Sequence, residues 1–530
     1  MLNKINIKTH VLILVLFQLI IFFINGNHKI SSSRPCSIHQ WRQTDCLSFT
    51  KNYYEEGMNF LEPKIHWQNV PEGKTISEFP IINYTVAALW KVFGEHEFLY
   101  RWLVYSIFVC SLCFLFYAVF LISNSHIYSY FTALLIGTSP VLCYYGFSFL
   151  ADVPAFSFSV IGFSCFVIYI KSQKTKYLYL SVLLAVLATL IKASAATSLL
   201  IIGFLFLLNL IGYKPLSKLF SLSKKQKISF TIFSVMCCIA IIIWYNWAYL
   251  YNNKNSNGVF LMETLPIWKM KDKVIETARL LYNEQFAMFL SKASLFILLI
   301  MMACVFLKMK ALSFYMKVSI VFSVISFFAF IILFFQVFNV HDYYLINSMF
   351  LPVIILAAVG EILNTIKINI ENRKVVFILS LVVFINVGYS ASKLRLRNIN
   401  QDGFMKYNPF ITNEEKNFSD WFHYNYDVTL KPLETITPQL RSFGINRNDL
   451  VLSAPDPSFN ISLYLMDQKG FTATSDVVVS DSTTIKNYIE KGLKYVVLND
   501  TTLYSKSAIL KAHAFKILDY KNIGVYKVKY

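Results

Sequence analysis

Long apolar runs recur over most of the chain, and they constrain its fold more than any other feature. A helix that spans a membrane needs about 20 mostly apolar residues. The first run, Val11–Ile24, is followed by no small-residue site at which a signal peptide would be cleaved, so it is expected to remain as a helix. Later runs are Leu99–Ile122, Ile127–Cys143, Val153–Ile170, Tyr177–Ile191, Ser194–Ile211, Ile228–Leu250, Met288–Leu307, Leu312–Phe338, Tyr343–Ile362 and Val375–Ser390. The sequence therefore predicts an all-α polytopic membrane protein with about 11 transmembrane helices.

Composition excludes the other broad classes of protein. Apolar residues make up 56% of the 530 residues and charged residues only 15%, whereas soluble domains carry roughly 25% charge. So few polar groups cannot cover the surface of a soluble enzyme, and neither a disordered nor a collagen-like chain has this composition. The aromatic share of 17% is typical of membrane proteins with aromatic belts at the bilayer interfaces.

The charges between the apolar runs predict the orientation. Lysines and arginines cluster in alternate loops, at 171–176, 214–227, 308–317 and 367–374, while acids collect in the other loops. Because basic loops stay in the cytoplasm, the N-terminus is expected inside, in a bacterial inner or plasma membrane. Counting the short apolar stretch Phe79–Phe93 as a span would reverse this pattern, so we predict a re-entrant or interfacial helix there. Residues 27–98 then form a large first extracytoplasmic loop.

The C-terminal part of the chain has a different pattern. Strand-like runs occur at Asp449–Ser453, Val477–Val479, Tyr495–Leu498 and Val525–Val528, with a helical pattern at Thr484–Gly492 between them. The prediction is a small extracytoplasmic α/β domain at 393–530, after a transmembrane domain at 1–392 that includes the 27–98 loop.

Only two of the nine cysteines, Cys36 and Cys46, lie outside apolar runs. They can form a disulfide in an oxidising compartment or remain two thiols, and the sequence leaves both alternatives open.

The densest group of polar residues is in the first extracytoplasmic loop: His39-Gln40-Trp41-Arg42-Gln43-Thr44-Asp45, followed by Tyr53-Tyr54-Glu55-Glu56-Gly57. A carboxylate there can take a proton from a hydroxyl, and burial against aromatic rings would raise its pKa toward neutrality. Arg42 can bind a phosphate through two hydrogen bonds, and Trp41 can contact a substrate. The alternative is an ordinary interfacial loop with an Arg–Asp pair and aromatic anchors.

Two further acids stand next to prolines at the start of apolar runs. Glu78 precedes Pro80, and Asp152 precedes Pro154. Either acid can face a substrate at the membrane boundary. Glu78 can also be a helix N-terminal acid stabilised by the helix dipole. Asp152 can also be a plain N-cap.

Cations and tyrosines mark two more boundaries. Lys192 stands between two apolar runs, where it can snorkel to the interface or face an anionic head group. In Val340-His341-Asp342-Tyr343-Tyr344, the histidine can donate to a phosphate oxygen and the tyrosines can stack on a ring. The alternative for this segment is an aromatic belt.

Motifs of several other chemistries are absent from the sequence. It has no GxxxxGK[ST] phosphate loop, no GxSxG nucleophile motif and no HExxH motif. No cysteine–histidine cluster has zinc spacing, so the sequence predicts no metal site and requires no cofactor.

Together these motifs resemble those of the integral-membrane glycosyltransferases of the GT-C fold. The similarity is to the family 39 group of dolichyl-phosphate-mannose–protein mannosyltransferases and related aminoarabinose transferases, over roughly residues 8–390. The motifs that carry it are Trp41-Arg42-Gln43-Thr44-Asp45, Ser77-Glu78-Phe79-Pro80, Ala151-Asp152-Val153-Pro154 and His341-Asp342-Tyr343-Tyr344.

The resemblance implies an inverting glycosyltransferase, a hexosyl- or pentosyltransferase that uses a polyprenyl-phosphate sugar and acts on the outer face. Asp45 matches the catalytic base of such enzymes, and Glu78 and Asp152 match their other two acids. The family often has a basic residue after the second acid, where this chain has Phe79. Arg42, Lys192 or His341 can supply that positive charge. Some members use a divalent metal and others do not, so the cofactor is unknown.

The implied partners are a polyprenyl-phosphate-sugar donor, membrane lipid and a glycolipid, glycan or protein acceptor, but no nucleic acid. The competing class is a transporter or flippase of a lipid-linked or anionic substrate. A transporter would place polar residues at the bilayer midplane, whereas the centres of these runs are largely free of acids. A third class, a receptor that presents the C-terminal domain, leaves the first-loop acids unexplained.

Overall fold

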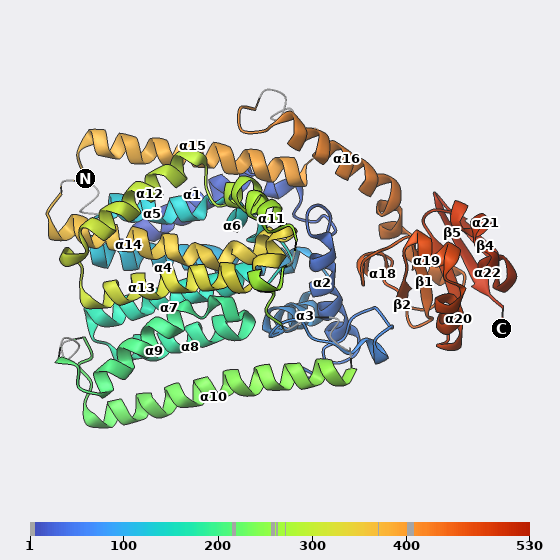
Figure 1. Cartoon of the computed structure of the whole chain (residues 1–530), viewed down its shortest axis with the longest axis horizontal. Coiled ribbons are helices and arrows are strands. Elements are labelled where there is room, and N and C mark those ends of the chain that lie inside the picture. The colour runs from blue at the N-terminus through green and yellow to red at the C-terminus, as the bar shows by residue number, and fades with distance from the viewer. Residues whose placement is uncertain are drawn as a thin grey trace. The chain divides into compact units, whose positions relative to one another are not determined.

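A computed structural model describes residues 6–214, 219–255, 260, 263–270, 272–368, 370–399 and 408–529, most of which are helical (Figure 1). The chain packs into two compact units. The first, here called the helical unit, comprises residues 1–30, 101–247 and 263–395. The second, here called the mixed unit, comprises residues 31–100, 248–262 and 396–530.

Among the described residues, seven helical segments are long and apolar enough to cross a membrane. They are α1 (Ile7–Ile24), α4 (Phe98–Ser123), α7 (Asp152–Ser172), α10 (Lys224–Asn255), α13 (Phe314–Leu333), the stretch Asp342–Thr365 formed by η11 (Asp342–Met349) and α14 (Phe350–Thr365), and α15 (Arg373–Asn398). The helical pair Val274–Met288 and Lys292–Leu307 adds an eighth if its two parts, bent by 98°, form one span. This pair contains α11 (Val274–Leu280) and α12 (Lys292–Leu307).

The expected count of about 11 spans is not confirmed, and helix length is the reason. The corresponding segments are helical as predicted, but α5 (His126–Gly137), α8 (Thr175–Ile191) and α9 (Thr197–Leu210) have 12, 17 and 14 residues. These helices are shorter than the roughly 20 residues that a straight span requires. A further short helix, α6 (Pro140–Tyr145), follows α5.

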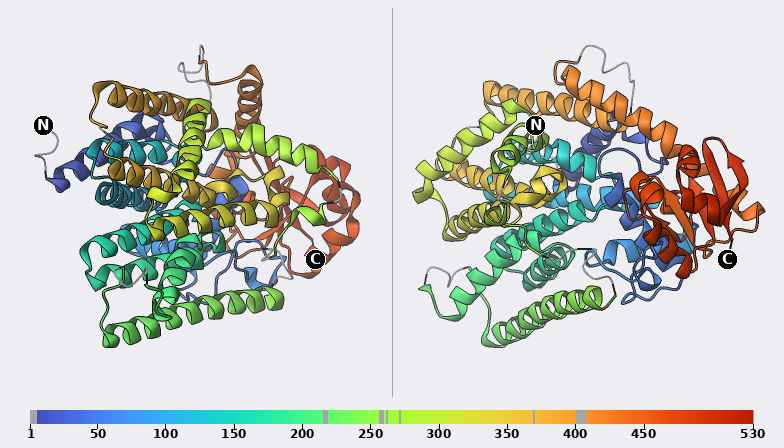
Figure 2. Two further views of the ribbon diagram at one scale, coloured as in Figure 1. Left: turned by 60° about the vertical axis from the view of Figure 1, so that its left-hand side comes forward. Right: turned by 45° about the vertical axis from the view of Figure 1, so that its right-hand side comes forward.

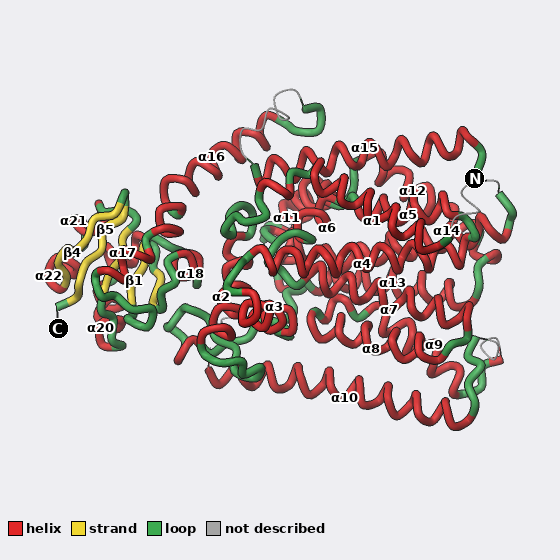
Figure 3. The backbone as a smooth tube through the Cα atoms, turned by 180° about the vertical axis from the view of Figure 1, so that it is seen from behind, coloured by secondary structure: helices red, strands yellow, loops and turns green. Residues whose placement is uncertain are grey.

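The helices of the helical unit lie side by side (Figure 2). In the most apolar 18-residue stretch of α7, 89% of the residues are buried, and the same share is buried in Asp342–Thr365. In the corresponding stretch of α10 only 11% are buried. The first two are therefore central, and α10 runs along the periphery beside α8 (Figures 1 and 3). Close packing of α7 on α8 requires Gly162, because a Cβ there would lie 3.0 Å from the Ser181 carbonyl oxygen.

The N-terminal part of the mixed unit contains α2 (Gln40–Glu55) packed on α3 (Ile81–Phe93). One face of α3 is buried through Ile82, Val86 and Trp90, while Val92 and Phe93 are exposed. Its 13 residues are too few to span a membrane, in agreement with the predicted re-entrant or interfacial helix. Its depth in a membrane stays a prediction.

The strands described in the C-terminal part form one five-stranded sheet in the order β2-β1-β3-β5-β4 (Figure 3). They are β1 (Val451–Ala454), β2 (Gly470–Thr472), β3 (Tyr495–Leu498), β4 (Ala514–Tyr520) and β5 (Ile523–Val528). β1 pairs in parallel with β2 and β3, and β5 runs antiparallel to β3 and β4. Helices of this part are α16 (Asn413–Thr429), α17 (Thr437–Ser442), α18 (Ile461–Leu465), α19 (Ser475–Ser480), α20 (Ser482–Glu490), α21 (Thr502–Lys506) and α22 (Ala508–His513).

Side chains that alternate along these strands fill two separate cores. Leu452 and Val496 belong to one core, and their neighbours Val451 and Val497 belong to the other. The sheet is therefore covered on both faces, as expected for the runs of apolar residues in β1 and β3. A small α/β fold is present at the C-terminus, as predicted.

Two details of the predicted sheet were wrong. The predicted strand Val477–Val479 is helical within α19, where only Val478 is buried among these three, so its β-branched side chains did not determine its structure. Strands β2 and β4 were not predicted. The first has three residues, and the second is an edge strand in which only one side chain is fully buried, so neither has a strong apolar pattern.

The two units do not follow the predicted domain boundary in every respect. Residues 31–100 pack with 396–530, although the sequence analysis grouped the 27–98 loop with the transmembrane helices. The division into a catalytic domain at 1–392 and an extracytoplasmic domain at 393–530 stays a prediction.

Candidate functional site

Helix α2 positions the first group of candidate residues, here called the Asp45 cluster: Asp45, Arg42, Glu78, Asn460 and Asp456. The helix begins at Gln40, after His39 in the left-handed conformation (φ 58°). Asp45 is only 2% exposed. It is an acid, whereas most buried residues of the described chain are apolar. A carboxylate that is removed from water needs partners, and the mixed unit supplies them.

Asn460 is the hydrogen-bond partner of Asp45. Its Nδ2 donates to Asp45 Oδ1 at 2.7 Å. The orientation of this amide is fixed, because the backbone N–H of Trp67 donates to Asn460 Oδ1 at 3.3 Å and the Ser48 hydroxyl lies 3.4 Å from the same oxygen. Asn460 therefore presents a donor to Asp45, not an acceptor.

Burial raises the pKa of Asp45 to about 7. The positive charge of Arg42 and the hydrogen bond from Asn460 lower this pKa, while the negative charges of Asp456 and Glu78 raise it, and desolvation is the largest of these effects. A carboxyl group with a pKa near the working pH is suited to accept a proton from a substrate.

Arg42 and Glu78 form an ion pair beside Asp45. Arg42 Nη2 lies 3.0 Å from Glu78 Oε2 and donates to Ser77 Oγ at 3.2 Å. The thiol of Cys46 donates to Glu78 Oε1 at 3.6 Å. The structure thus brings together three of the candidate residues, and the contact of Arg42 with a donor phosphate stays a prediction.

No disulfide joins Cys36 to Cys46 or forms elsewhere in the described ranges, which contain all nine cysteines. Of the two alternatives that the sequence left open, the structure contains two thiols.

Aromatic rings lie next to Asp45. Trp41, one helical turn before Asp45, is 38% exposed, and its ring centroid is 5.1 Å from that of Phe459. Phe459 in turn packs at 4.7 Å from Trp67. An exposed indole packed against another aromatic ring is suited to contact a sugar or lipid substrate. The role of Trp41 in substrate contact stays a prediction.

The second group lies in the helical unit and is here called the Lys192 cluster: Lys192, Asp152, His341, Tyr343 and Tyr344. Lys192 Nζ lies 2.8 Å from Asp152 Oδ1. Asp152 is 1% exposed and is the first residue of α7, whose N-cap is Ala151, so the alternative of Asp152 as an N-cap is wrong. Lys192 ends α8 in an extended conformation that separates it from α9.

The start of η11, which precedes α14, supplies the aromatic residues of the Lys192 cluster. Lys192 Nζ lies 5.6 Å from the ring centroid of Tyr343 and 5.1 Å from that of Tyr344. The ring of His341 lies 5.2 and 5.9 Å from these two rings. The hydroxyl of Tyr145 donates to Asp342, which buries a second carboxylate next to this group. The structure therefore gathers all five residues, and their contact with a phosphate or a ring stays a prediction.

Asn460 and Asp456 were not predicted from the sequence. Both follow the carboxyl end of β1, and residues at the carboxyl ends of parallel strands often bind ligands. Asp456 accepts from the backbone N–H and hydroxyl of Ser458 and from the backbone N–H of Ser462, so it shapes the turn that holds Asn460. The position of this turn after a predicted strand was the signal that could have found it.

In the part of the chain that the structure describes, no three histidine, cysteine, aspartate or glutamate side chains gather as metal ligands. Asp45 instead accepts from Asn460, Glu78 pairs with Arg42, and Asp152 pairs with Lys192.

Comparison with models of known families and with curated protein sequences finds no match. Comparison with solved structures finds several matches. The apo crystal structure of ArnT from Cupriavidus metallidurans matches with a TM-score of 0.56 and 10% identity, over 98% of each chain. ArnT bound to undecaprenyl phosphate matches with a TM-score of 0.55 and 11% identity, over 98% of this chain and 97% of that one. Arabinofuranosyltransferase AftD from Mycobacteria matches with a TM-score of 0.56 and 11% identity, over 98% of this chain and 40% of AftD.

The chain has the GT-C fold. The resemblance that the four motifs implied is thus confirmed for the fold. At 10–11% identity the likeness establishes the fold and leaves the reaction to be argued from the side chains.

Proposed function

We propose that this GT-C protein is an inverting glycosyltransferase that transfers a sugar from a polyprenyl-phosphate donor to an acceptor hydroxyl on the outer face of a membrane. The observation that carries the proposal is Asp45, a buried carboxyl group with a raised pKa, held by Asn460. The fold supports it, since one of the similar structures, ArnT, was solved with undecaprenyl phosphate.

In the proposed reaction, Asp45 accepts the proton of the acceptor hydroxyl while that oxygen attacks the anomeric carbon of the donor sugar. The bond between this carbon and the phosphate oxygen breaks on the opposite face, and the phosphate leaves with the electron pair. Attack and departure on opposite faces invert the anomeric configuration. In this scheme Glu78 holds Arg42 in place, and Arg42 stabilises developing negative charge.

The Lys192 cluster is proposed to bind the donor phosphate. Lys192 and His341 supply the donors, and Tyr343 and Tyr344 contact the head group. Asp152 fixes the direction of the Lys192 ammonium through their ion pair. A divalent metal is not required by this scheme, because charged side chains can neutralise the phosphate. We propose these residue roles together with a cytoplasmic N-terminus and an extracytoplasmic C-terminal domain.

The test combines the purified protein with undecaprenyl-phosphate-linked pentoses and hexoses and with glycolipid, glycan and protein acceptors from the same cells. Mass spectrometry is expected to find a sugar added to one acceptor class, and NMR should show an inverted anomeric centre. Cell-surface glycans compared with and without the gene identify the acceptor in vivo. Vesicles that translocate the lipid-linked sugar without transferring it would favour the transporter or flippase instead.

Turnover is expected to rise with pH through about 7, because the proposed base must be ionised and burial places the pKa of Asp45 there. The effect of Asp45 on stability has the opposite sign. Its pKa is higher in the folded protein than in the unfolded chain, so ionisation between about pH 4 and pH 7 lowers the free energy of unfolding. A pH–rate profile from 5 to 9, recorded with thermal unfolding at each pH, measures both effects. A flat profile across pH 6–8 would contradict the assignment.

A further inference from the structure

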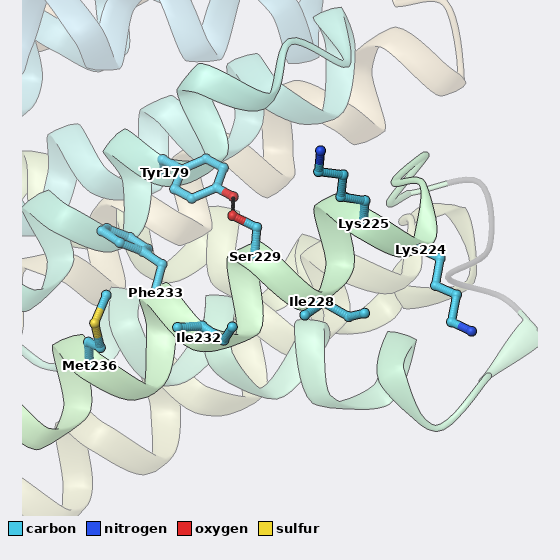
Figure 4. Close-up of a pocket in the computed structure, with 8 residues that line it drawn as sticks. All are labelled: Tyr179, Lys224, Lys225, Ile228, Ser229, Ile232, Phe233 and Met236. Carbon is cyan, nitrogen blue, oxygen red and sulfur yellow. Dashed lines mark hydrogen bonds between the residues drawn. The ribbon is translucent and has the colours of Figure 1, made fainter.

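A groove between α8 and α10 shares no lining residue with either cluster of candidate catalytic residues. It has a volume of about 760 Å³ and belongs entirely to the helical unit (Figure 4). Tyr179 of α8 forms one side. The α10 residues that line it are Lys224, Lys225, Ile228, Ser229, Ile232, Phe233 and Met236.

The groove is amphipathic along its length. Ile228, Ile232 and Met236 recur every four residues and form an apolar wall, as Figure 4 shows. Lys224 and Lys225 are exposed at the end of the groove where α10 begins. Within the described residues, neither lysine forms an ion pair. The hydroxyl of Tyr179 donates to Ser229 at 3.0 Å and joins the two helices beside the wall.

The length of α10 places this charged end at one membrane surface. Its 32 residues give a helix of about 48 Å, longer than the roughly 30 Å hydrocarbon core of a bilayer. At the other end, Asn252 exchanges hydrogen bonds with the backbone of Ile76, two residues before Glu78. The lysines therefore lie at the surface opposite to that end of α10.

We propose that this groove binds an anionic phospholipid of the leaflet that surrounds the start of α10. The phosphate lies against Lys224 and Lys225, and an acyl chain lies along the wall formed by Ile228, Ile232 and Met236. The choice of occupant follows from charge complementarity, because two unpaired cations join a continuous apolar strip at a membrane surface. A zwitterionic lipid would leave the lysine charges uncompensated, and a water-soluble anion would leave the apolar strip uncovered.

The experiment uses the full-length protein in nanodiscs of phosphatidylcholine that contain a small fraction of phosphatidylglycerol, followed by native mass spectrometry of the retained lipid. The wild type is expected to retain phosphatidylglycerol selectively. Lys224→Gln with Lys225→Gln should lower that selectivity about 25-fold, since each lysine near an anionic head group contributes about fivefold. Lys308→Gln with Lys310→Gln removes the same charge from two exposed lysines outside the groove and should change nothing.

A second pair of variants tests the apolar wall. Ile232→Trp fills the groove and should release the lipid with both lysines intact. Ile239→Trp, at an exposed α10 position outside the lining, should not. Equal retention of both lipids by the wild type would overturn the proposal, as would an unchanged selectivity in the Lys224/Lys225 variant. Displacement of the retained phosphatidylglycerol by inorganic phosphate alone would identify a soluble anion as the ligand. That result would also overturn the proposal.

A separate observation, the fixed amide of Asn460, carries a second inference, which rests on the proposed function. We infer that Asn460 is a positioning residue that holds the proposed base in its ionised form and leaves Asp45 Oδ2 for the acceptor hydroxyl. The C-terminal domain thereby supplies part of the catalytic apparatus. The charged groups that shift the pKa of Asp45 are Arg42, Asp456 and Glu78. The uncharged amide of Asn460 donates a hydrogen bond directly to the Asp45 carboxylate.

Asn460→Ala is expected to lower kcat more than it raises KM, and to move the rising limb of the pH–rate profile upward by about one unit, because a hydrogen bond to a charged group is lost. Asn487→Ala, at an exposed position of α20, is the control. Infrared difference spectra against Asp45→Asn follow the titration of Asp45 without any transfer assay. If Asp45 titrates at the same pH in Asn460→Ala as in the wild type, the positioning role is overturned even when sugar transfer occurs. If the titration of Asp45 shifts in Asn460→Ala but the wild type transfers no sugar, only the proposed function is contradicted.

Discussion

Replacing Asp45 by asparagine is expected to lower turnover by about 100- to 10,000-fold, the usual contribution of a positioned general base. The amide has the same shape as the carboxyl group and can still accept the hydrogen bond from Asn460. It cannot accept a proton from the acceptor hydroxyl. Donor binding should persist, because the proposed phosphate contacts lie on other residues.

The same variant makes a prediction about stability that does not depend on the reaction. Ionised Asp45 is unfavourable in its buried position, so Asp45→Asn should unfold at a temperature equal to or above that of the wild type at pH 8, and the difference should vanish near pH 4. Turnover and thermal unfolding measured on one preparation separate loss of the base from loss of the fold. Asp476→Asn, an exposed acid of α19, is the matched control. Wild-type turnover in Asp45→Asn would remove the base role and leave the fold unaffected.

Composition and periodicity were sufficient to predict the membrane class and the positions of most helices. The strands β1, β3 and β5 were also predictable, because they are the buried strands with strong apolar patterns. The number of spans was not, since an apolar run and a helix long enough to cross a bilayer are different properties. The 12 residues of α5, for example, lie in an apolar run of ordinary appearance.

Glu78, Asp152 and Lys192 could be found because each is a charged residue beside an apolar run, where desolvation makes a charge costly. Asp45 and Arg42 could be found because they stand in the densest polar group of the first loop. Their partners could not be found in the same way. Asn460 lies 415 residues from Asp45 in the sequence, and a neutral amide in a predicted loop has no distinctive pattern. The ion pair between Asp152 and Lys192 was equally hidden, since their separation depends on the packing of α7 against α8.

The second large effect is expected for Lys192→Met. This change leaves the carboxylate of Asp152 buried without the cation 2.8 Å away. Breaking a buried ion pair costs about 3–5 kcal/mol. Because Lys192 is partly exposed, the expected loss of unfolding free energy is about 3 kcal/mol. If Lys192 also binds the donor phosphate, affinity for undecaprenyl phosphate should fall by at least about tenfold.

The double variant Lys192→Met with Asp152→Asn separates these two roles of Lys192. Removing the buried negative charge should restore most of the stability, because no uncompensated ion remains. It should not restore the binding of undecaprenyl phosphate, because the cation is still missing. Thermal unfolding and a titration with undecaprenyl phosphate provide the two readouts. If the double variant binds this lipid as well as the wild type does, the ion pair between Asp152 and Lys192 has a structural role only. The donor phosphate must then be bound by other cations, and Arg42 and His341 are the next to test.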